Sequence, residues 1–562
     1  MTPLDPDERR TPPERPAGTH DELPATEPAA SPASEGTAPA RLLDRLDDAS
    51  LARERAATPE AALGDLAPHP HLPPVQLRPH ARGLEPDART RARWMEAAST
   101  HVLDLLEAIP ERPAHGHSGA EALALAERAS APIPERPLEG GMDEALERIG
   151  VAMDGALEAA GPGYLAYVPG GGLYAAALAD MIADVGNRFT GYAMAAPGWV
   201  RLEQDVLAWL AKEFGYGPEA RGLLTPGSSM ANFTALVTAR HHHFGDTGDY
   251  SRAIVYTSTQ CHHSVAKAVS MAGVPRANLR QVPVDPLFRM DVEALARAVE
   301  ADRHRGLQPF CVIAASGTTN TGAVDPLPGL ARLCQAEDLW LHIDGAYGGA
   351  FVLCEAGRAR LRGIEAADSL CFDPHKGMFL PYGTGCLLVR EGTRLAAAHV
   401  GEADYLRDFE ATQLPSPAHL GPELSRPYRG LRLWLALMLH GAGAFREALH
   451  EKLALAQLCA DGLDARIAAG APLEIVARPQ LSTVVFRLRR REGEALADYD
   501  ARNIALKAAI NARGRVFLSS TLLPTREGDG EAVSLRACVL SFRTHEAIIE
   551  ALLEDLDAAL DD

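Results

Sequence analysis

Short apolar runs and amphipathic stretches alternate along the middle of the chain, from about residue 145 to about residue 400. Four runs bounded by polar, Gly or Pro residues predict buried strands: "RAIVYTST", "FCVIAASG", "WLHID" and "SLCFD". Stretches such as "EQDVLAWLAKEF" and "SMANFTALVTARHHHF" have the spacing of helices. This alternation predicts an α/β fold, with a mostly parallel sheet covered by helices on both faces.

The pattern changes on either side of this region. After about residue 430, "LSTVVFRLR", "GRVFLSSTLL" and "AVSLRACVLSF" predict strands flanked by helices, as in a smaller α+β domain. Before it, "ARTRARWMEAASTHVLDLLEAIPER" has helical periodicity and ends at a proline. The expected organisation is a tail (1–85), an N-terminal helical segment (86–145), a large domain (146–425) and a small C-terminal domain (426–562).

The tail differs from the rest in composition. Residues 1–40 hold nine prolines among Ala, Glu, Thr and Ser. Such a segment buries too little apolar surface to offset its ordering entropy, so we expect most of it to be disordered. Its start has neither the apolar core of a secretory signal nor the acid-poor composition of a transit peptide.

Charge and cysteine content narrow the class of protein. The formal net charge of −20 argues against a nucleic-acid or anionic-membrane partner, because both require basic surface. The eight cysteines form no CxxC pair, which argues against a zinc ribbon. With no run of 18 apolar residues, the expectation is a soluble, cytoplasmic protein.

Polar residues gather where predicted strands end, which is where parallel sheets bind ligands. Asp344 ends "WLHID", and Lys376 follows "SLCFD". Gly227, Ser228 and Ser229 lead into a helix, as a phosphate site or a helix cap would. Each of these residues, taken alone, also fits an ordinary structural role, such as a helix cap or a turn residue. The triplet His241–His243 is interpreted as a solvated helix end. Together, a lysine, an aspartate and a phosphate cradle match the needs of pyridoxal phosphate.

The sequence resembles the group II pyridoxal-phosphate-dependent amino-acid decarboxylases, which include the aromatic-L-amino-acid, glutamate and histidine decarboxylases. The resemblance rests on "WLHIDGAYGG" followed 32 residues after its Asp by the lysine of "DPHK", with "SGTTNTGAVDPL" upstream. It runs from about residue 90 to the C-terminus. It implies a fold-type I enzyme that decarboxylates an L-amino acid to an amine and carbon dioxide.

The resemblance also implies the role of each site residue. Lys376 forms the Schiff base with the cofactor, and Asp344 pairs with its ring nitrogen. His262 stacks on one face of the ring and Ala346 lies against the other. The remaining cofactor contacts are Ser228 and Ser229 at the phosphate, Thr318, and His375.

Two further segments concern the substrate and the proton. "GEADYLRDFEATQLP" resembles the family's mobile catalytic loop, which makes Tyr405 the proton donor; the alternative is an exposed loop aromatic. "GYLAYVPGGGLY" contains no Arg or Lys to pair a side-chain carboxylate, and it resembles the substrate pocket of aromatic decarboxylases. Tyr167 and Gly170 are therefore expected to line the pocket of an aromatic substrate, unless the glycines only shape a turn.

The sequence departs from the family pattern at two positions and leaves alternatives open. The family often has Glu where Met230 stands and an aromatic residue where Gly377 stands, which indicates a divergent, bacterial-type branch. An aldehyde synthase, an aminotransferase or a non-enzymatic relative on the same fold remains an alternative. The family forms homodimers with the active site at the subunit interface, so a homodimer is expected.

Overall fold

The computed structural model describes residues 84–115, 119–246, 248–401 and 414–561. The chain divides into two units, residues 1–90 and 91–562, and residues 84–90 are the described part of the first. The predicted tail thus lies almost entirely outside the described residues. Among the helices that are described, none has both the length and the apolar character needed to cross a membrane.

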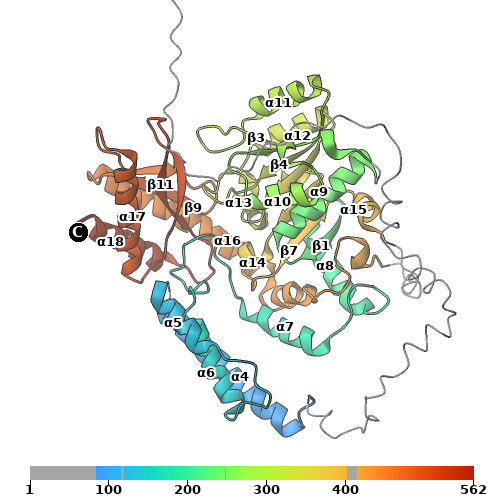
Figure 1. The fold of residues 1–562 in the computed structure, drawn as a ribbon, viewed down its shortest axis with the longest axis vertical. Coiled ribbons are helices and arrows are strands. Elements are labelled where there is room, and N and C mark those ends of the chain that lie inside the picture. Colours follow the sequence, from blue (N-terminus) through green and yellow to red (C-terminus); the bar gives the residue numbers. More distant parts are fainter. Residues whose placement is uncertain (1–83, 116–118, 247, 402–413, 562) are drawn as a thin grey trace, which may run out of the picture. The chain divides into compact units, whose positions relative to one another are not determined.

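A seven-stranded sheet forms the centre of the larger domain (Figure 1). Its order is β1-β7-β6-β5-β4-β2-β3, and all its neighbours pair in parallel except β7, which is antiparallel to both β1 and β6. The strands are β1 (Arg221–Thr225), β2 (Ala253–Ser258), β3 (Leu279–Val282), β4 (Gln308–Ala315), β5 (Trp340–Asp344), β6 (Ser369–Phe372) and β7 (Gly385–Val389). The predicted mostly parallel sheet is confirmed.

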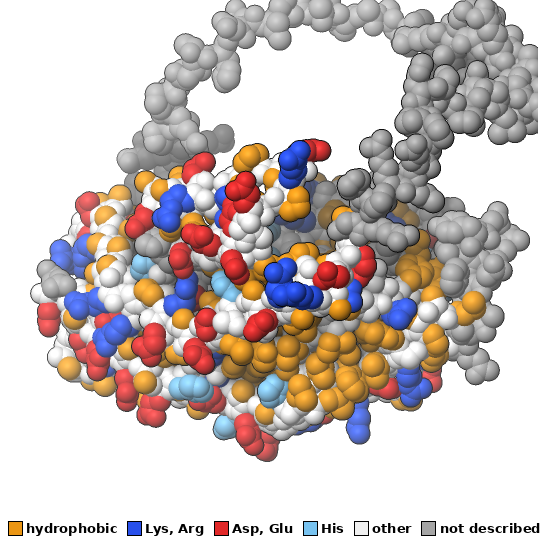
Figure 2. Space-filling model, turned by 90° about the horizontal axis from the view of Figure 1, so that it is seen from below, with side chains coloured by type: hydrophobic (Ala, Val, Ile, Leu, Met, Phe, Trp, Pro, Cys, Tyr) orange, Lys and Arg blue, Asp and Glu red, His pale blue; other side chains and the backbone are white. Residues whose placement is uncertain are grey.

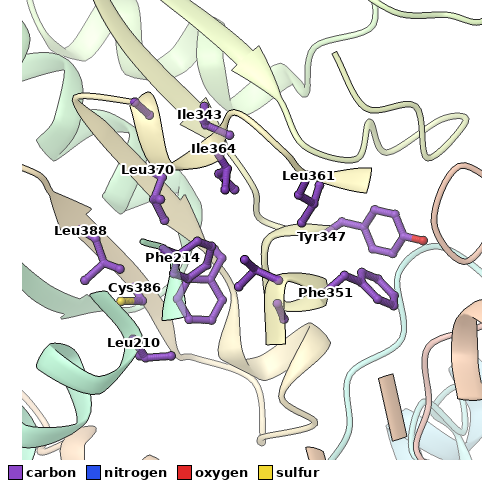
Figure 3. Close-up of a cluster of buried hydrophobic side chains, with 14 of the residues drawn as sticks. Leu210, Phe214, Ile343, Tyr347, Phe351, Leu361, Ile364, Leu370, Cys386 and Leu388 are labelled. Atoms are coloured by element: carbon purple, nitrogen blue, oxygen red, sulfur yellow. The ribbon is translucent and has the colours of Figure 1, made fainter. Parts of the chain in front are cut away.

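Helices cover both faces of this sheet, as predicted. One face packs on α9 (Ser228–Phe244), α10 (His263–Met271) and α15 (Gly392–His399), and its core includes Trp340 and Cys371. The other face packs on α8 (Pro197–Glu213), α11 (Val292–His304), α12 (Leu327–Ala336) and α16 (Gly430–Ala468). Figure 3 shows part of this second core, in which Ile343 and Leu370 from the sheet lie with Phe214 and Phe351.

A smaller α+β domain follows, also as predicted. Its antiparallel sheet has the order β10-β11-β9-β8 and packs with α16, α17 (Leu496–Ala512) and α18 (Glu546–Asp561) around its own core. The strands are β8 (Leu473–Ala477), β9 (Thr483–Leu488), β10 (Ser519–Pro524) and β11 (Glu531–Cys538). Tyr347 of the large domain accepts a hydrogen bond from the Ser482 amide at 2.8 Å, which connects the two domains.

The remaining helices lie before the sheet or in its connections. The N-terminal ones are α4 (Ala88–Ala108), α5 (Gly119–Ala129) and α6 (Gly141–Asp154), and none of them has a buried side chain. Next comes α7 (Tyr174–Gly186), which packs on α16. The short helices α13 (Glu355–Arg360) and α14 (Pro374–Gly377) follow β5 and β6. The exact domain boundaries remain a prediction.

Candidate active site

A cavity of about 220 Å³ opens at the carboxyl ends of β2, β4, β5 and β6. The N-termini of α9 and α10 point into the same region, as expected for a ligand site in a parallel sheet. All eight side chains predicted to contact the cofactor line this cavity: Ser228, Ser229, His262, Thr318, Asp344, Ala346, His375 and Lys376. The structure therefore brings together residues that are up to 148 positions apart in the sequence.

Lys376 lies on α14, directly after β6, and is largely buried. Its Nζ is 2.9 Å from Oδ2 of Asp373. Burial lowers the pKa of this amine, but the charge and hydrogen bond of Asp373 and the nearby Asp344 carboxylate outweigh burial, so the pKa is raised above 10.5. Lys376 is held as a paired cation at the floor of the cavity.

Asp373 also organises the start of α9. Its Oδ1 accepts hydrogen bonds from the backbone amide of Ser228 at 2.7 Å and from the Ser228 hydroxyl at 2.9 Å. Ser229, the next residue, is exposed in the first turn of the helix and lines the cavity. One carboxylate thus connects the lysine to the helix terminus that was predicted to bind phosphate.

Asp344 ends β5 with its carboxylate at the cavity wall. Oδ2 accepts a hydrogen bond from Asn232 Nδ2 at 2.9 Å, and Oδ1 accepts one from the Ala346 amide at 3.0 Å. Because β5 and β6 are parallel neighbours, with Asp344 opposite Cys371, Asp344 and Lys376 reach the same edge of the sheet. This adjacency explains why two residues 32 positions apart line one cavity.

His262 caps α10 and presents a neutral ring. Its Nδ1 accepts a hydrogen bond from the Ser264 amide at 3.3 Å, which places the ring proton on Nε2. Burial and the adjacent His263 lower the pKa of His262 below 6.5, although Asp344 opposes the effect. A neutral, partly buried imidazole in the cavity wall suits stacking on an aromatic ligand.

His375 and Thr318 are both buried and both hydrogen-bonded within the protein. His375 donates from Nδ1 to the Thr384 carbonyl at 2.7 Å, and burial lowers its pKa. The Thr318 hydroxyl accepts from the Ala323 amide at 3.1 Å and lies 2.9 Å from the Thr321 hydroxyl. These contacts shape the wall of the cavity.

The predicted substrate residues lie elsewhere. Tyr167 has a left-handed backbone (φ 49°) and a side chain that is 58% exposed, and it does not line the cavity. Gly170 is buried, and a Cβ there would lie 2.6 Å from the ring of Tyr382, which packs on His375. Their substrate role stays a prediction. Tyr405 lies outside the described residues.

Three residues that support the site were not predicted from the sequence. Asp373 holds Lys376, Asn232 holds Asp344, and His342 contacts Asn232. Asp373 could have been predicted from the sequence, because it stands three residues before the lysine in "DPHK". Asn232 and His342 could not, because their contacts join segments 110 residues apart.

A second, larger cavity of about 520 Å³ lies near the amino ends of β5 and β6, away from the carboxyl ends that line the first cavity. His242, Trp340 and Arg394 are among its lining residues, and it contains none of the residues predicted for the active site. Within the ranges that the structure describes, no group of three His, Cys, Asp or Glu side chains is arranged to hold a metal ion.

The donor set of the smaller cavity fits pyridoxal phosphate. A lysine amine, a carboxylate fixed at a strand end, a neutral imidazole and a helix N-terminus surround a space of about 220 Å³. These groups suit the aldehyde, the ring nitrogen, the ring face and the phosphate of that cofactor. Fold and site define a pyridoxal-phosphate-dependent enzyme of fold type I.

Comparisons with known proteins extend this assignment. Residues 139–489 match the model of the pyridoxal-dependent decarboxylase conserved domain. An aromatic-L-amino-acid decarboxylase of Bacillus atrophaeus is 38% identical over 386 residues, covering 68% of this chain and 78% of the relative. The tryptophan decarboxylase TDC1 of Camptotheca acuminata is 30% identical over 372 residues, covering 64% and 73%. This chain belongs to the pyridoxal-dependent decarboxylase family and is a pyridoxal-phosphate-dependent carboxy-lyase.

Solved structures show the same fold. The crystal structure of Oryza sativa TDC with PLP and tryptamine has a TM-score of 0.76 and 25% identity, covering 84% of this chain and 98% of that one. The tryptophan decarboxylase of Catharanthus roseus, solved with L-tryptophan, has a TM-score of 0.76 at 23% identity, covering 85% and 99%. The predicted family, fold and cofactor are confirmed.

Proposed function

We propose that this enzyme decarboxylates an aromatic L-amino acid to the corresponding amine and carbon dioxide. The observation that carries the proposal is the placement of Lys376, Asp344 and His262 around one cavity, after the carboxyl ends of β6, β5 and β2. The choice of an aromatic substrate is supported by relatives named as aromatic-L-amino-acid and tryptophan decarboxylases. It is also supported by the absence of Arg and Lys from "GYLAYVPGGGLY".

Each residue has a role in this proposal. Lys376 would hold the cofactor covalently through its amine. Asp344 would hold a proton at the cofactor's ring nitrogen, His262 would pack on the ring, and Ser228 and Ser229 would bind the phosphate. Pyridoxal phosphate, when bound, supplies an electron sink for the electron pair that remains when the carboxyl group leaves.

The proton that replaces the carboxyl group must come from the protein or from water. We assign its delivery to Tyr405, whose phenol has a weakly acidic proton of the kind that general acids use. Tyr405→Phe is expected to retain the cofactor and to release carbon dioxide, while part of the product under air becomes aldehyde, ammonia and peroxide. Amine formation at the wild-type rate without peroxide would remove Tyr405 from the mechanism.

The decisive experiment is a product assay on purified enzyme supplied with pyridoxal phosphate. A panel of aromatic, acidic and basic L-amino acids is tested for amine, carbon dioxide, aldehyde and oxo-acid. Amine and carbon dioxide from aromatic substrates support the proposal. Aldehyde with peroxide would identify an aldehyde synthase, oxo-acid an aminotransferase, and no turnover of any amino acid a non-enzymatic relative.

Attachment of the cofactor is tested separately by borohydride reduction and peptide mapping. The whole chain contains only five lysines: Lys212, Lys267, Lys376, Lys452 and Lys507. The label is expected on Lys376, and Lys376→Arg should abolish it. A label on any other lysine would contradict the assignment of the site.

We also propose that the enzyme is a homodimer. Large apolar side chains are exposed on α7 (Met181, Ile182 and Val185) and on α16 (Met438 and Leu439). Figure 2, which views the molecule from the side where α7 lies in Figure 1, shows hydrophobic side chains gathered on that face. An exposed apolar patch of this kind is typical of a protein–protein interface. Sedimentation of an active monomer would refute the proposal.

A cytoplasmic location is proposed from the cysteines. All eight lie in described segments, none is in a disulfide, and seven of them are buried. Free thiols in this number fit a reducing compartment. Localisation of the protein in a bacterial cell by fractionation tests this point.

A further inference from the structure

A continuous line of buried hydrogen bonds leads away from the candidate active site through the interior of the large domain. Trp340 Nε1 donates to Ser369 Oγ at 2.8 Å, and Ser369 Oγ is 2.8 Å from His342 Nδ1. His342 Nε2 is 2.7 Å from Asn232 Oδ1, and Asn232 Nδ2 donates to Asp344 Oδ2 at 2.9 Å. The first four residues are at most 2% exposed. The line ends at the carboxylate that faces the cofactor cavity.

The fold brings these residues together from three elements. Trp340, His342 and Asp344 alternate along β5, so their side chains point to the same face of the sheet. Ser369 is the residue directly opposite His342 on the neighbouring strand β6. Asn232 comes from the first turns of α9, which packs on that face.

The chemistry at the two ends fixes the direction of every bond between them. The indole of Trp340 is only a donor, and an ionised carboxylate at Asp344 is only an acceptor. Asn232 must therefore turn its NH₂ group to Asp344 and its oxygen to His342. His342 must then carry its proton on Nε2, and Ser369 must donate to Nδ1 while it accepts from Trp340. One arrangement satisfies all four bonds, and in it each group donates toward Asp344.

Protonation of His342 would change this arrangement. A second proton on the His342 ring would face the Ser369 hydroxyl, which would then have to turn its own proton away from His342. Burial lowers the pKa of His342 to about 4, so the ring is neutral at physiological pH. The bond directions given above therefore belong to the neutral form of His342.

We propose that Trp340, Ser369, His342 and Asn232 are positioning residues that hold the Asp344 carboxylate oriented toward the ring nitrogen of pyridoxal phosphate. This inference rests on the proposed role of Asp344. The dipoles of the four bonds align toward the carboxylate and stabilise its negative charge. An ionised Asp344 in turn stabilises the protonated form of the ring nitrogen, on which the electron sink depends.

A purely structural role for the same contacts predicts different results, and a matched control separates the two. Asn503 in the small domain is also fully buried, donates to the Tyr499 carbonyl at 3.1 Å and accepts from the Leu488 amide at 2.9 Å. Asn503→Ala should lower the melting temperature much as Asn232→Ala does. Only Asn232→Ala should change how the protein binds the cofactor.

Two measurements test the proposal. The first is the affinity of purified apoenzyme for pyridoxal phosphate, measured by titration. The second is the ¹⁵N chemical shift of the ring nitrogen in labelled cofactor bound to the enzyme, followed against pH. Asn232→Ala should weaken binding about tenfold or more, the range expected for the loss of a hydrogen bond to a charged group. It should also lower the pH at which the ring nitrogen loses its proton.

A second position provides a graded test that does not remove a contact to Asp344. Ser369→Ala removes the hydroxyl between Trp340 and His342 and should shift both measurements in the same direction, by less. Ser369→Thr retains the hydroxyl and should restore the wild-type values. This pair also keeps the proposal testable if Asn232→Ala does not fold.

Each outcome is decisive. If wild-type apoenzyme binds pyridoxal phosphate while Asn232→Ala and Ser369→Ala match Asn503→Ala in both measurements, the positioning role is wrong and the proposed function stands. If wild-type enzyme does not bind the cofactor, the proposed function and the positioning role are both wrong.

Discussion

Replacing Asp373 with asparagine is expected to make Lys376 a stronger nucleophile in the apoenzyme. The substitution keeps the shape of the side chain and the oxygen that accepts from Ser228, but it removes the charge 2.9 Å from Lys376 Nζ. Burial, which lowers the pKa of Lys376, is then opposed mainly by the Asp344 carboxylate. The pKa of the amine should fall.

The distance between Lys376 Nζ and Asp373 Oδ2 sets a lower limit for the fall in the pKa of Lys376. Two unit charges 2.9 Å apart attract by about 1.4 kcal/mol even with the dielectric constant of water, and by about 6 kcal/mol at an effective dielectric constant of 20. Since 1.4 kcal/mol is about a factor of ten, the neutral fraction of Lys376 at pH 8 should rise at least about tenfold. Below its pKa the neutral fraction of an amine increases with pH, so the variant's reactivity curve should shift to lower pH.

Competitive acetylation of the apoenzyme measures this directly. Trace labelled acetic anhydride is applied between pH 6 and pH 11, and peptides containing Lys376 and the exposed Lys267 are compared by mass spectrometry. Lys267 provides an exposed reference amine in the same sample. An unchanged curve for Lys376 in Asp373→Asn would show that the ion pair does not control the amine, and the electrostatic description of the site would be wrong.

Three further predictions concern the surroundings of the site. Gly377→Phe places a Cβ 2.4 Å from Ala350 Cβ and should destabilise the fold by about 1–3 kcal/mol in urea unfolding, with partial recovery in combination with Ala350→Gly. His342→Gln should reduce the loss of stability between pH 6.5 and pH 4 by about 3 kcal/mol, because the unfolded chain protonates His342 in this range while the folded chain, with a pKa of about 4, does not. Glu203→Gln leaves the fully buried Arg426 without its charge partner at 2.5 Å and should cost about 3–5 kcal/mol in the same urea assay.

The fold could be predicted from the sequence where a strand lies in an apolar run bounded by polar, Gly or Pro residues. The runs that contain β2, β4, β5 and β6 were recognised, and the carboxyl ends of these strands line the candidate site. Strand β3 was missed because its four residues, "LRQV", alternate too briefly to give a signal. Strand β7 was missed because "GCLLV" follows a turn and runs antiparallel, which the alternation of strands and helices does not predict.

The candidate site was predictable to the extent that its residues stand at strand ends. Asp344 and Lys376 could be located because the end of a parallel strand is where ligands bind. Asn232 could not, because within "SMANF" it is an ordinary polar residue of a helix, and its hydrogen bonds to His342 and Asp344 join it to a strand far along the chain. The bonds from Ser228 to Asp373 were also unpredictable, since both side chains had other plausible partners.

The alternation along β5 also constrains how this protein can change over generations. Trp340, His342 and Asp344 occupy one face of the strand, while Leu341 and Ile343 belong to the core on the other face. A single substitution changes one side chain. The insertion or deletion of one residue within β5 would instead move some of the hydrogen-bonded residues and some of the core residues to the wrong face of the strand. The indole, imidazole and carboxylate would lose their partners in the same step that placed polar groups in the apolar core. Strand β5 can therefore vary in composition but not in length.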